Sequence, residues 1–121
     1  MKQKVHSVSY LAKAEFEFKN GVYDLVALPT GAEVVKVALE VVGTPTAGTV
    51  SVGFKDEKSL PKSYFLILEN TNNNKNATSA KDYTATSNKV VVAEVKNANG
   101  NDVKGVLRVL YFLPSVIEVE Y

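Results

Sequence analysis

The sequence predicts an all-β protein, an antiparallel two-sheet sandwich that is jelly-roll-like and has about eight or nine short strands. Three observations lead to this prediction. Apolar and polar residues alternate with a period of two along most of the chain, turn residues separate the alternating runs, and no segment has a convincing helical pattern. The chain has 121 residues, the size of one domain, so we expect a single sandwich domain over 1–121.

The first half of the chain is expected to hold four strands. Asn20-Gly21 lies between two alternating runs and is typical of a type I′ hairpin turn. A two-residue loop here would pair Phe18 with Tyr23 and Phe16 with Leu25 on one apolar face. The strands expected in this half are 13–18, 22–28, 33–42 and 49–54.

The second half is expected to alternate short strands with polar loops. Residues 55–63 are charged and contain a proline, so we expect a loop, and the asparagine-rich stretch 70–79 has the composition of a mobile surface loop. A second hairpin is expected around 97–101. The strands expected in this half are 64–68, 83–86, 89–96, 103–113 and 116–121.

Composition excludes several classes of protein. The net charge is only +1, which argues against a dedicated nucleic-acid-binding protein, and the absence of cysteine excludes disulfide scaffolds and thiolate metal sites. No uncharged apolar stretch is long enough to span a membrane, and no signal peptide is evident. We therefore expect synthesis in the cytoplasm and no membrane partner.

The residues offer no catalytic set. His6 is the only histidine, it is not followed by a recognisable nucleophile motif, and most carboxylates alternate singly with apolar residues as on solvated strands. Asp56-Glu57 and Asn101-Asp102 do not match a calcium-binding loop, and no glycine-rich nucleotide motif is present. We expect no enzymatic activity, no cofactor and no metal. Tyr83, in polar surroundings, is the one tyrosine that could offer a stacking platform for a glycan.

Several strands are apolar on both faces, although the outer face of a sandwich sheet should be polar. In 103–113 and in 33–42, apolar residues occupy both alternating sets, and no helix is available to cover the excess. We expect an outer sheet face to be buried against a second copy or another protein. The expected interface residues are Val106, Leu110, Phe112, Val34 and Val42.

The order of these segments resembles small β-sandwich structural proteins encoded among the head and tail morphogenesis genes of tailed phages and prophages. The resemblance covers about 20–113 and depends on 23–34, 48–54, 89–92 and the closing Gly105 to Tyr111. It implies a non-enzymatic virion component, such as a head decoration, head-fibre or minor tail protein, that forms homo-oligomers or binds other virion proteins. The alternative function is a carbohydrate-binding or adhesin-like sandwich that uses the loops around Tyr83.

Overall fold

The computed structural model describes residues 2–6, 8–55, 61–69, 71, 73–113 and 116–120, and in 2–6 and 116–120 it describes the backbone alone. These residues form strands and turns, and no helix is found among them. The strands are β1 (Lys2–His6), β2 (Ser9–Glu17), β3 (Gly21–Leu28), β4 (Glu33–Val42), β5 (Ala47–Phe54), β6 (Leu66–Leu68), β7 (Asn76–Ser79), β8 (Tyr83–Thr84), β9 (Lys89–Asn99), β10 (Lys104–Phe112) and β11 (Val116–Glu120).

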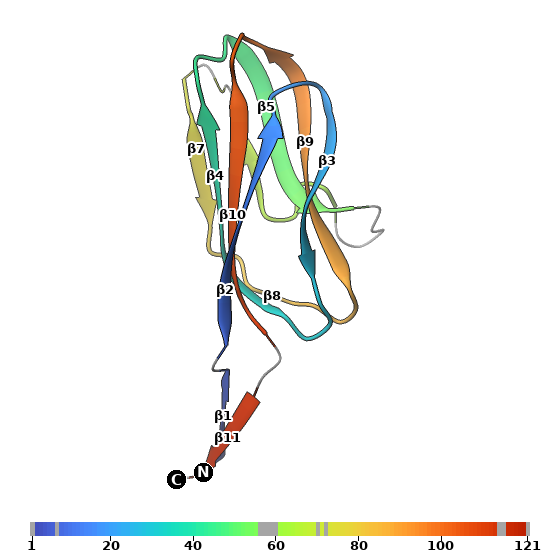
Figure 1. Cartoon of the computed structure of the whole chain (residues 1–121), viewed down its shortest axis with the longest axis vertical. Coiled ribbons are helices and arrows are strands. Elements are labelled where there is room, and N and C mark those ends of the chain that lie inside the picture. Colours follow the sequence, from blue (N-terminus) through green and yellow to red (C-terminus); the bar gives the residue numbers. More distant parts are fainter. Residues whose placement is uncertain are drawn as a thin grey trace.

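Two antiparallel sheets pack face to face (Figure 1). One has the order β2-β10-β4-β7, with the short β8 also paired to β4, and the other has the order β3-β9-β5-β6. Most consecutive strands lie in opposite sheets, so the chain passes repeatedly from one sheet to the other. This order is that of a double-sheet jelly roll, and it confirms the predicted fold class.

Both predicted hairpins are wrong, because the strands concerned belong to different sheets. β2 pairs with β10 while β3 pairs with β9, so the chain arches across the core at 18–20. The same holds for β9 and β10 at the second expected hairpin. Phe16 and Tyr23 do meet, with ring centroids 5.5 Å apart, but they meet across the gap between the sheets and not as neighbours in one sheet.

The core lies between the two sheets and is dominated by valine, leucine and phenylalanine. β-branched residues suit this position because they pack well on a pleated surface. Phe54 lies at its aromatic end, where its ring contacts Tyr64, Phe65 and Tyr83 at centroid distances of 5.2, 5.2 and 4.6 Å. The side chains that are fully buried include Leu28, Val37, Leu39, Val50, Val52, Val91 and Leu107.

Part of the asparagine-rich stretch is an edge strand and not the predicted mobile loop. Asn76–Ser79 forms β7, which pairs with β4. Next to this pairing, the Val41 N–H donates a hydrogen bond of 2.7 Å to the Lys75 carbonyl. Ala77 faces the core, whereas Asn76 and Thr78 are exposed. The predicted loop 55–63 falls largely on 56–60, outside the described residues.

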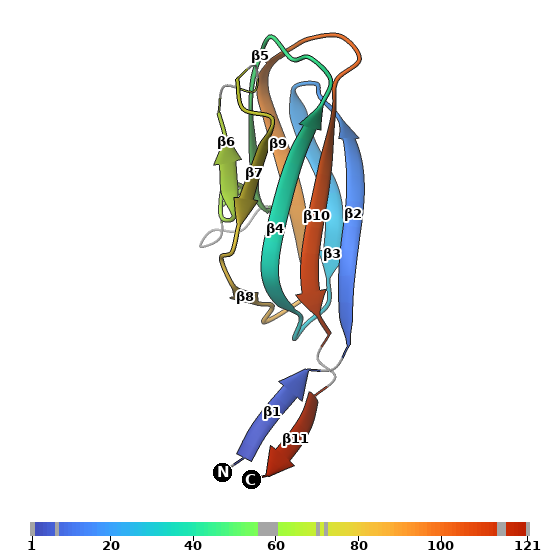
Figure 2. The same cartoon turned by 90° about the vertical axis from the view of Figure 1, so that its left-hand side faces the viewer.

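β1 and β11 form a separate two-stranded ribbon beyond one end of the sandwich (Figures 1 and 2). The strand expected at 116–121 therefore exists over 116–120, but it pairs with β1 and not with a strand of the sandwich. The β1 strand itself was not predicted. In the part of the chain that the structure describes, no helix is long and apolar enough to cross a membrane.

Candidate assembly interface

The outer face of the β2-β10-β4-β7 sheet carries four of the five residues that the sequence indicated as an interface, and Val34 is the exception. Along β10, Leu107, Val109 and Tyr111 face the core. Val106, Arg108, Leu110 and Phe112 alternate with them and face outward. β10 is thus apolar on both faces, as the sequence indicated.

Charged side chains surround Val106 on this outer face. It lies opposite Glu15 on β2 and Glu40 on β4. Lys104 Nζ is 3.4 Å from Glu15 Oε2, and Arg108 Nη1 is 3.4 Å from Glu40 Oε1, so an ion pair lies on each side of Val106. Val106 is only 3% exposed as a result. It has the predicted orientation, but ion pairs surround it and little of it is open to a partner.

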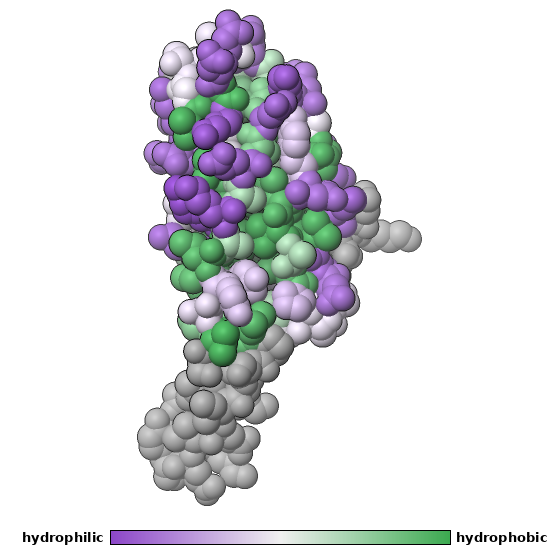
Figure 3. Space-filling view, viewed as in Figure 1, coloured by the Kyte–Doolittle hydropathy of each residue, from purple (hydrophilic) through white to green (hydrophobic). Residues whose placement is uncertain are grey.

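The part of the face nearer the ribbon is apolar and open. Leu11 on β2 lies opposite Leu110 on β10 and is 63% exposed. Leu110 and Phe112, two positions apart on β10, are partly exposed beside it. We call Leu11, Leu110 and Phe112 the β10 patch. Figure 3 shows hydrophilic residues over much of the upper sandwich and hydrophobic residues in its middle and lower parts.

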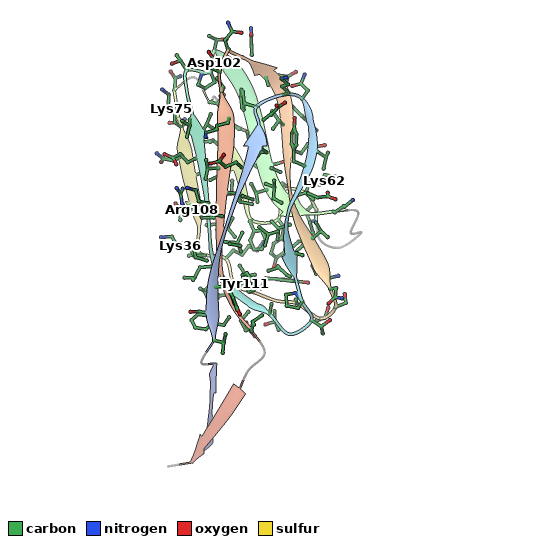
Figure 4. All side chains as sticks on the ribbon, viewed as in Figure 1. Lys36, Lys62, Lys75, Asp102, Arg108 and Tyr111 are labelled. Carbon is green, nitrogen blue, oxygen red and sulfur yellow. The ribbon has the colours of Figure 1, made fainter. Side chains whose placement is uncertain are left out.

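Cations border the β10 patch. Lys13 is the next outward residue after Leu11 on β2, and Lys36 on β4 lies opposite Leu110. Arg108 completes this border, and Figure 4 shows Arg108 and Lys36 on the same side of the sandwich. Glu33, opposite Phe112, is the acid at the lower end, and its Oε1 accepts a hydrogen bond of 2.7 Å from the Thr84 hydroxyl.

The prediction that Val34 faces outward is wrong, since Val34 is 0% exposed in the core. The register between β10 and β4 shifts at Leu110/Tyr111, which places Lys36 opposite Leu110 but Val34 opposite Tyr111. The irregularity adds one residue to β4, and on the N-terminal side of Lys36 it reverses which residues face the core and which face outward. Val42, above the irregularity, is 39% exposed at the far end of the strand, away from the β10 patch.

A groove at the open side of the sandwich was missed by the sequence analysis. It has a volume of about 950 Å³ and runs between the edge strands β2 and β3. Its apolar lining is Phe16, Val22, Tyr23 and Leu25, and charged residues form its rim, among them the Lys55–Asp24 pair at 2.8 Å. No local signal could have indicated it, because it depends on which strands end each sheet.

Tyr83 does not form the predicted stacking platform. Its ring is half-buried and packs on Phe54 and Tyr64, with centroids 4.6 and 5.7 Å away, so its face is already occupied by the core. His6 lies in β1, where only the backbone is described. Among the residues whose side chains the structure describes, no group of three or more His, Cys, Asp or Glu residues could hold a metal ion.

The fold is a double-sheet jelly roll, an architecture found in viral capsid domains and in lectin domains, and one outer sheet face carries an open apolar patch. Comparison with known structures makes this more specific. A chain of the acidic stable capsid structure of Helicobacter pylori bacteriophage KHP30 superposes with a TM-score of 0.91, is 74% identical and matches over 100% of both chains. A chain of the cyanophage Pam1 capsid asymmetric unit has a TM-score of 0.68 and 22% identity, covering 88% of this chain and 85% of that one, and shares the fold.

The chain belongs to the family of phage structural proteins that includes the KHP30 capsid chain. This confirms the predicted resemblance and the predicted function as a structural protein of a phage particle. No model of a known protein family matches the sequence, and no curated protein matches it.

Proposed function

We propose that this chain is a non-enzymatic head decoration protein that binds the shell of a phage capsid through the β10 patch. The observation that carries this proposal is the full-length match at 74% identity to a chain of the KHP30 capsid structure. Of the three virion roles that the sequence suggested, a head role agrees with this match, since that structure is a capsid. The proposed partner is a shell protein of the same particle.

The β10 patch supports docking because its apolar residues are exposed on a preformed, rigid sheet. Leu11 leaves most of its side chain in water in the free protein. Fully burying a leucine contributes roughly 1.5–3 kcal/mol, so covering the exposed part of Leu11 contributes about 1–2 kcal/mol. A preformed sheet loses little backbone entropy on binding, which leaves more of this contribution in the affinity.

The border of the patch defines the chemistry of the partner surface. Lys13, Lys36 and Arg108 surround most of the apolar residues, with Glu33 at one end. We therefore expect a flat apolar partner surface with acidic residues at its edge. Such complementarity sets orientation and the association rate more than the affinity.

The test is binding of the purified chain to capsid shells that lack it, measured by co-sedimentation. Leu11→Ser should weaken binding about 5- to 30-fold, the equivalent of about 1–2 kcal/mol. Ile67→Ser is the matched control, because Ile67 is 52% exposed on the outer face of the opposite sheet and pairs with Ser51. Equal effects of the two variants, or unchanged binding by Leu11→Ser at unchanged melting temperature, would overturn the role of the β10 patch.

A further inference from the structure

The edge strand β3 is open along one side of the sandwich. In the described part of the chain, β3 pairs only with β9, so its other edge has no neighbouring strand. The groove of about 950 Å³ follows this edge, since four consecutive residues of β3, 22–25, line it. Successive strand residues point to opposite faces of a sheet, so a groove lined by all four includes the backbone edge itself. Figure 1 shows β2 and β3 separating below the arch that joins them.

β3 carries accessible apolar residues on both of its faces. Tyr23 and Leu25 pack against the core but are only half-buried. Val22 alternates with them, faces outward and is 44% exposed. Asp24 is the charged residue of β3 in the groove, and Lys55 pairs with it at 2.8 Å. An open apolar edge of this kind can pair with a strand of another chain.

The other edge strands of the sandwich are protected in the ways that natural sheets use. On β2, the outward residues at 13, 15 and 17 are all charged. β7 has polar residues, Asn76 and Thr78, at its exposed positions, and β6 has only three residues. β6 and β7 also contact each other, although they belong to different sheets. Among the edge strands that the structure describes, β3 is therefore the one with an open apolar edge.

The edge and the groove together define the chemistry of an occupant. A segment in the extended conformation can pair with the N–H and C=O groups of β3 and so add a strand to the sheet. Alternate side chains of this segment would point toward Phe16, Tyr23 and Leu25, so they should be apolar. The charged residues of the rim are three acids and three bases, which favour no net charge: Glu15, Glu17, Asp24, Lys55, Lys62 and Lys104.

The sandwich of a second copy does not offer such a segment. The apolar side chains of its strands are already buried between its own sheets, as Phe16 and Val26 are, and cannot enter the groove of a neighbour. A segment that lies outside any sheet before it binds keeps both rows of its side chains available. The shell protein is the better source, because Leu11 of the β10 patch lies on β2, the strand that forms the other wall of the groove.

We propose that β3 accepts an extended, uncharged segment of the shell protein, which pairs with the backbone at 21–24 and places apolar side chains in the groove. The register shift between Asp24 and Val26 ends the regular part of the edge, so the added strand is short. This inference rests on the proposed function, since it takes the shell as the partner. It deepens that function by adding a contact made through backbone hydrogen bonds to the apolar contact of the β10 patch.

The test uses the full chain and capsid shells that lack it, with binding measured by co-sedimentation. Val22→Lys places a charge on the open edge and should weaken binding about 10-fold or more. The variant should keep the wild-type melting temperature, because the new side chain lies opposite Glu94 on β9. Ile67→Lys is the matched control, since Ile67 is 52% exposed on β6, at the opposite edge of the same sheet, and this variant should bind as the wild type does.

Val22→Thr separates strand pairing from a simple apolar contact. Threonine has nearly the shape of valine and is also common in strands, so backbone pairing should persist and binding should change by less than about 3-fold. If Val22→Thr weakens binding as much as Val22→Lys does, the shell contacts the side chain and no strand is added, and the proposal fails.

Hydrogen exchange of the shell-bound chain gives a direct readout of the pairing. In the free chain, alternate N–H groups of β3 point toward β9, and the others point to the open edge. Shell binding should slow the exchange of this second set at 21–24 by about 10-fold or more, whereas exchange along β6 should not change. Unchanged exchange at 21–24 in the bound chain would contradict the proposal.

The outcomes distinguish this inference from the proposed function. If Leu11→Ser weakens binding and Val22→Lys does not, only the added strand is wrong. If Val22→Lys weakens binding, exchange at 21–24 is slowed and Leu11→Ser has no effect, only the role of the β10 patch is wrong. A chain that does not bind shells contradicts both proposals.

Discussion

Replacing Gly105 with alanine tests how the Phe16 ring of β2 packs over the neighbouring strand β10. Gly105 is buried on β10 and lies opposite Phe16 on β2 and Val41 on β4. A Cβ atom added at Gly105 would be 2.5 Å from Cε2 of Phe16 and closer still to two other atoms of that ring. Since β10 is held between β2 and β4, its backbone cannot move aside, and the Phe16 ring must move instead.

The magnitude follows from three effects. Overpacking a core costs about 1–3 kcal/mol, and moving Phe16 weakens its contact with Tyr23, an aromatic pair that contributes about 0.5–1.5 kcal/mol. Removing a glycine from a strand offsets about 0.5–1 kcal/mol of this. We expect Gly105→Ala to lower the free energy of unfolding by about 1–3 kcal/mol, or the melting temperature by about 3–6 °C for each kcal/mol.

The assay is a double-mutant cycle by urea denaturation at fixed protein concentration, since association also stabilises the native state. Phe16→Leu removes the ring atoms that Gly105→Ala would strike. In the Phe16→Leu background, the alanine should cost less than half of what it costs in the wild type. If it costs the same in both backgrounds, or less than about 0.5 kcal/mol in the wild type, then the ring does not fill the space above Gly105.

Two further predictions concern residues of β4 and β10, one on the register of β4 and one on the ion pair of the outer face. Val34→Ala should lower the free energy of unfolding by about 1–3 kcal/mol because Val34 is fully buried, whereas Val42→Ala should change it by less than about 0.5 kcal/mol. Equal effects of the two substitutions in urea denaturation would contradict the shifted register of β4. Arg108→Ala should lower the free energy of unfolding by less than about 1 kcal/mol, because the ion pair with Glu40 is partly exposed to solvent. A larger loss in thermal denaturation would mean that Arg108 also holds Val106 in place.

The sequence predicts where the strands lie more reliably than which strands pair. Phe16 and Tyr23 both lie on apolar strand faces. A hairpin would place these two faces side by side in one sheet, whereas an arch places them on opposite sides of the core. The alternation of apolar and polar residues is therefore compatible with a hairpin and with an arch. Only the connection between the two strands distinguishes a hairpin from an arch, and Asn20-Gly21 does not join two paired strands as a type I′ turn would. Gly21 takes a positive φ of 152°, while the Asn20 side chain accepts a hydrogen bond of 2.8 Å from the Ala98 N–H, 78 residues away.

The candidate site was predictable to the extent that it depends on one strand. The two apolar faces of β10 follow from its own residues, and the structure agrees with them. Val34 could not be placed, because a register shift leaves no mark in a run rich in valine. Leu11 was missed because the predicted first strand began at 13, although β2 begins at Ser9.

The pairing of β2 with β10 also determines when this protein can fold. Glu15 and Lys104 form an ion pair although they are 89 residues apart in sequence, and among the strands of the sandwich only β5 and β6 are both consecutive and paired. A nascent chain on the ribosome therefore cannot complete the β2-β10-β4 sheet until β10 has emerged. Folds dominated by such distant contacts form in milliseconds to seconds, and until then the exposed edges of β2 and β4 must be kept from pairing with other chains.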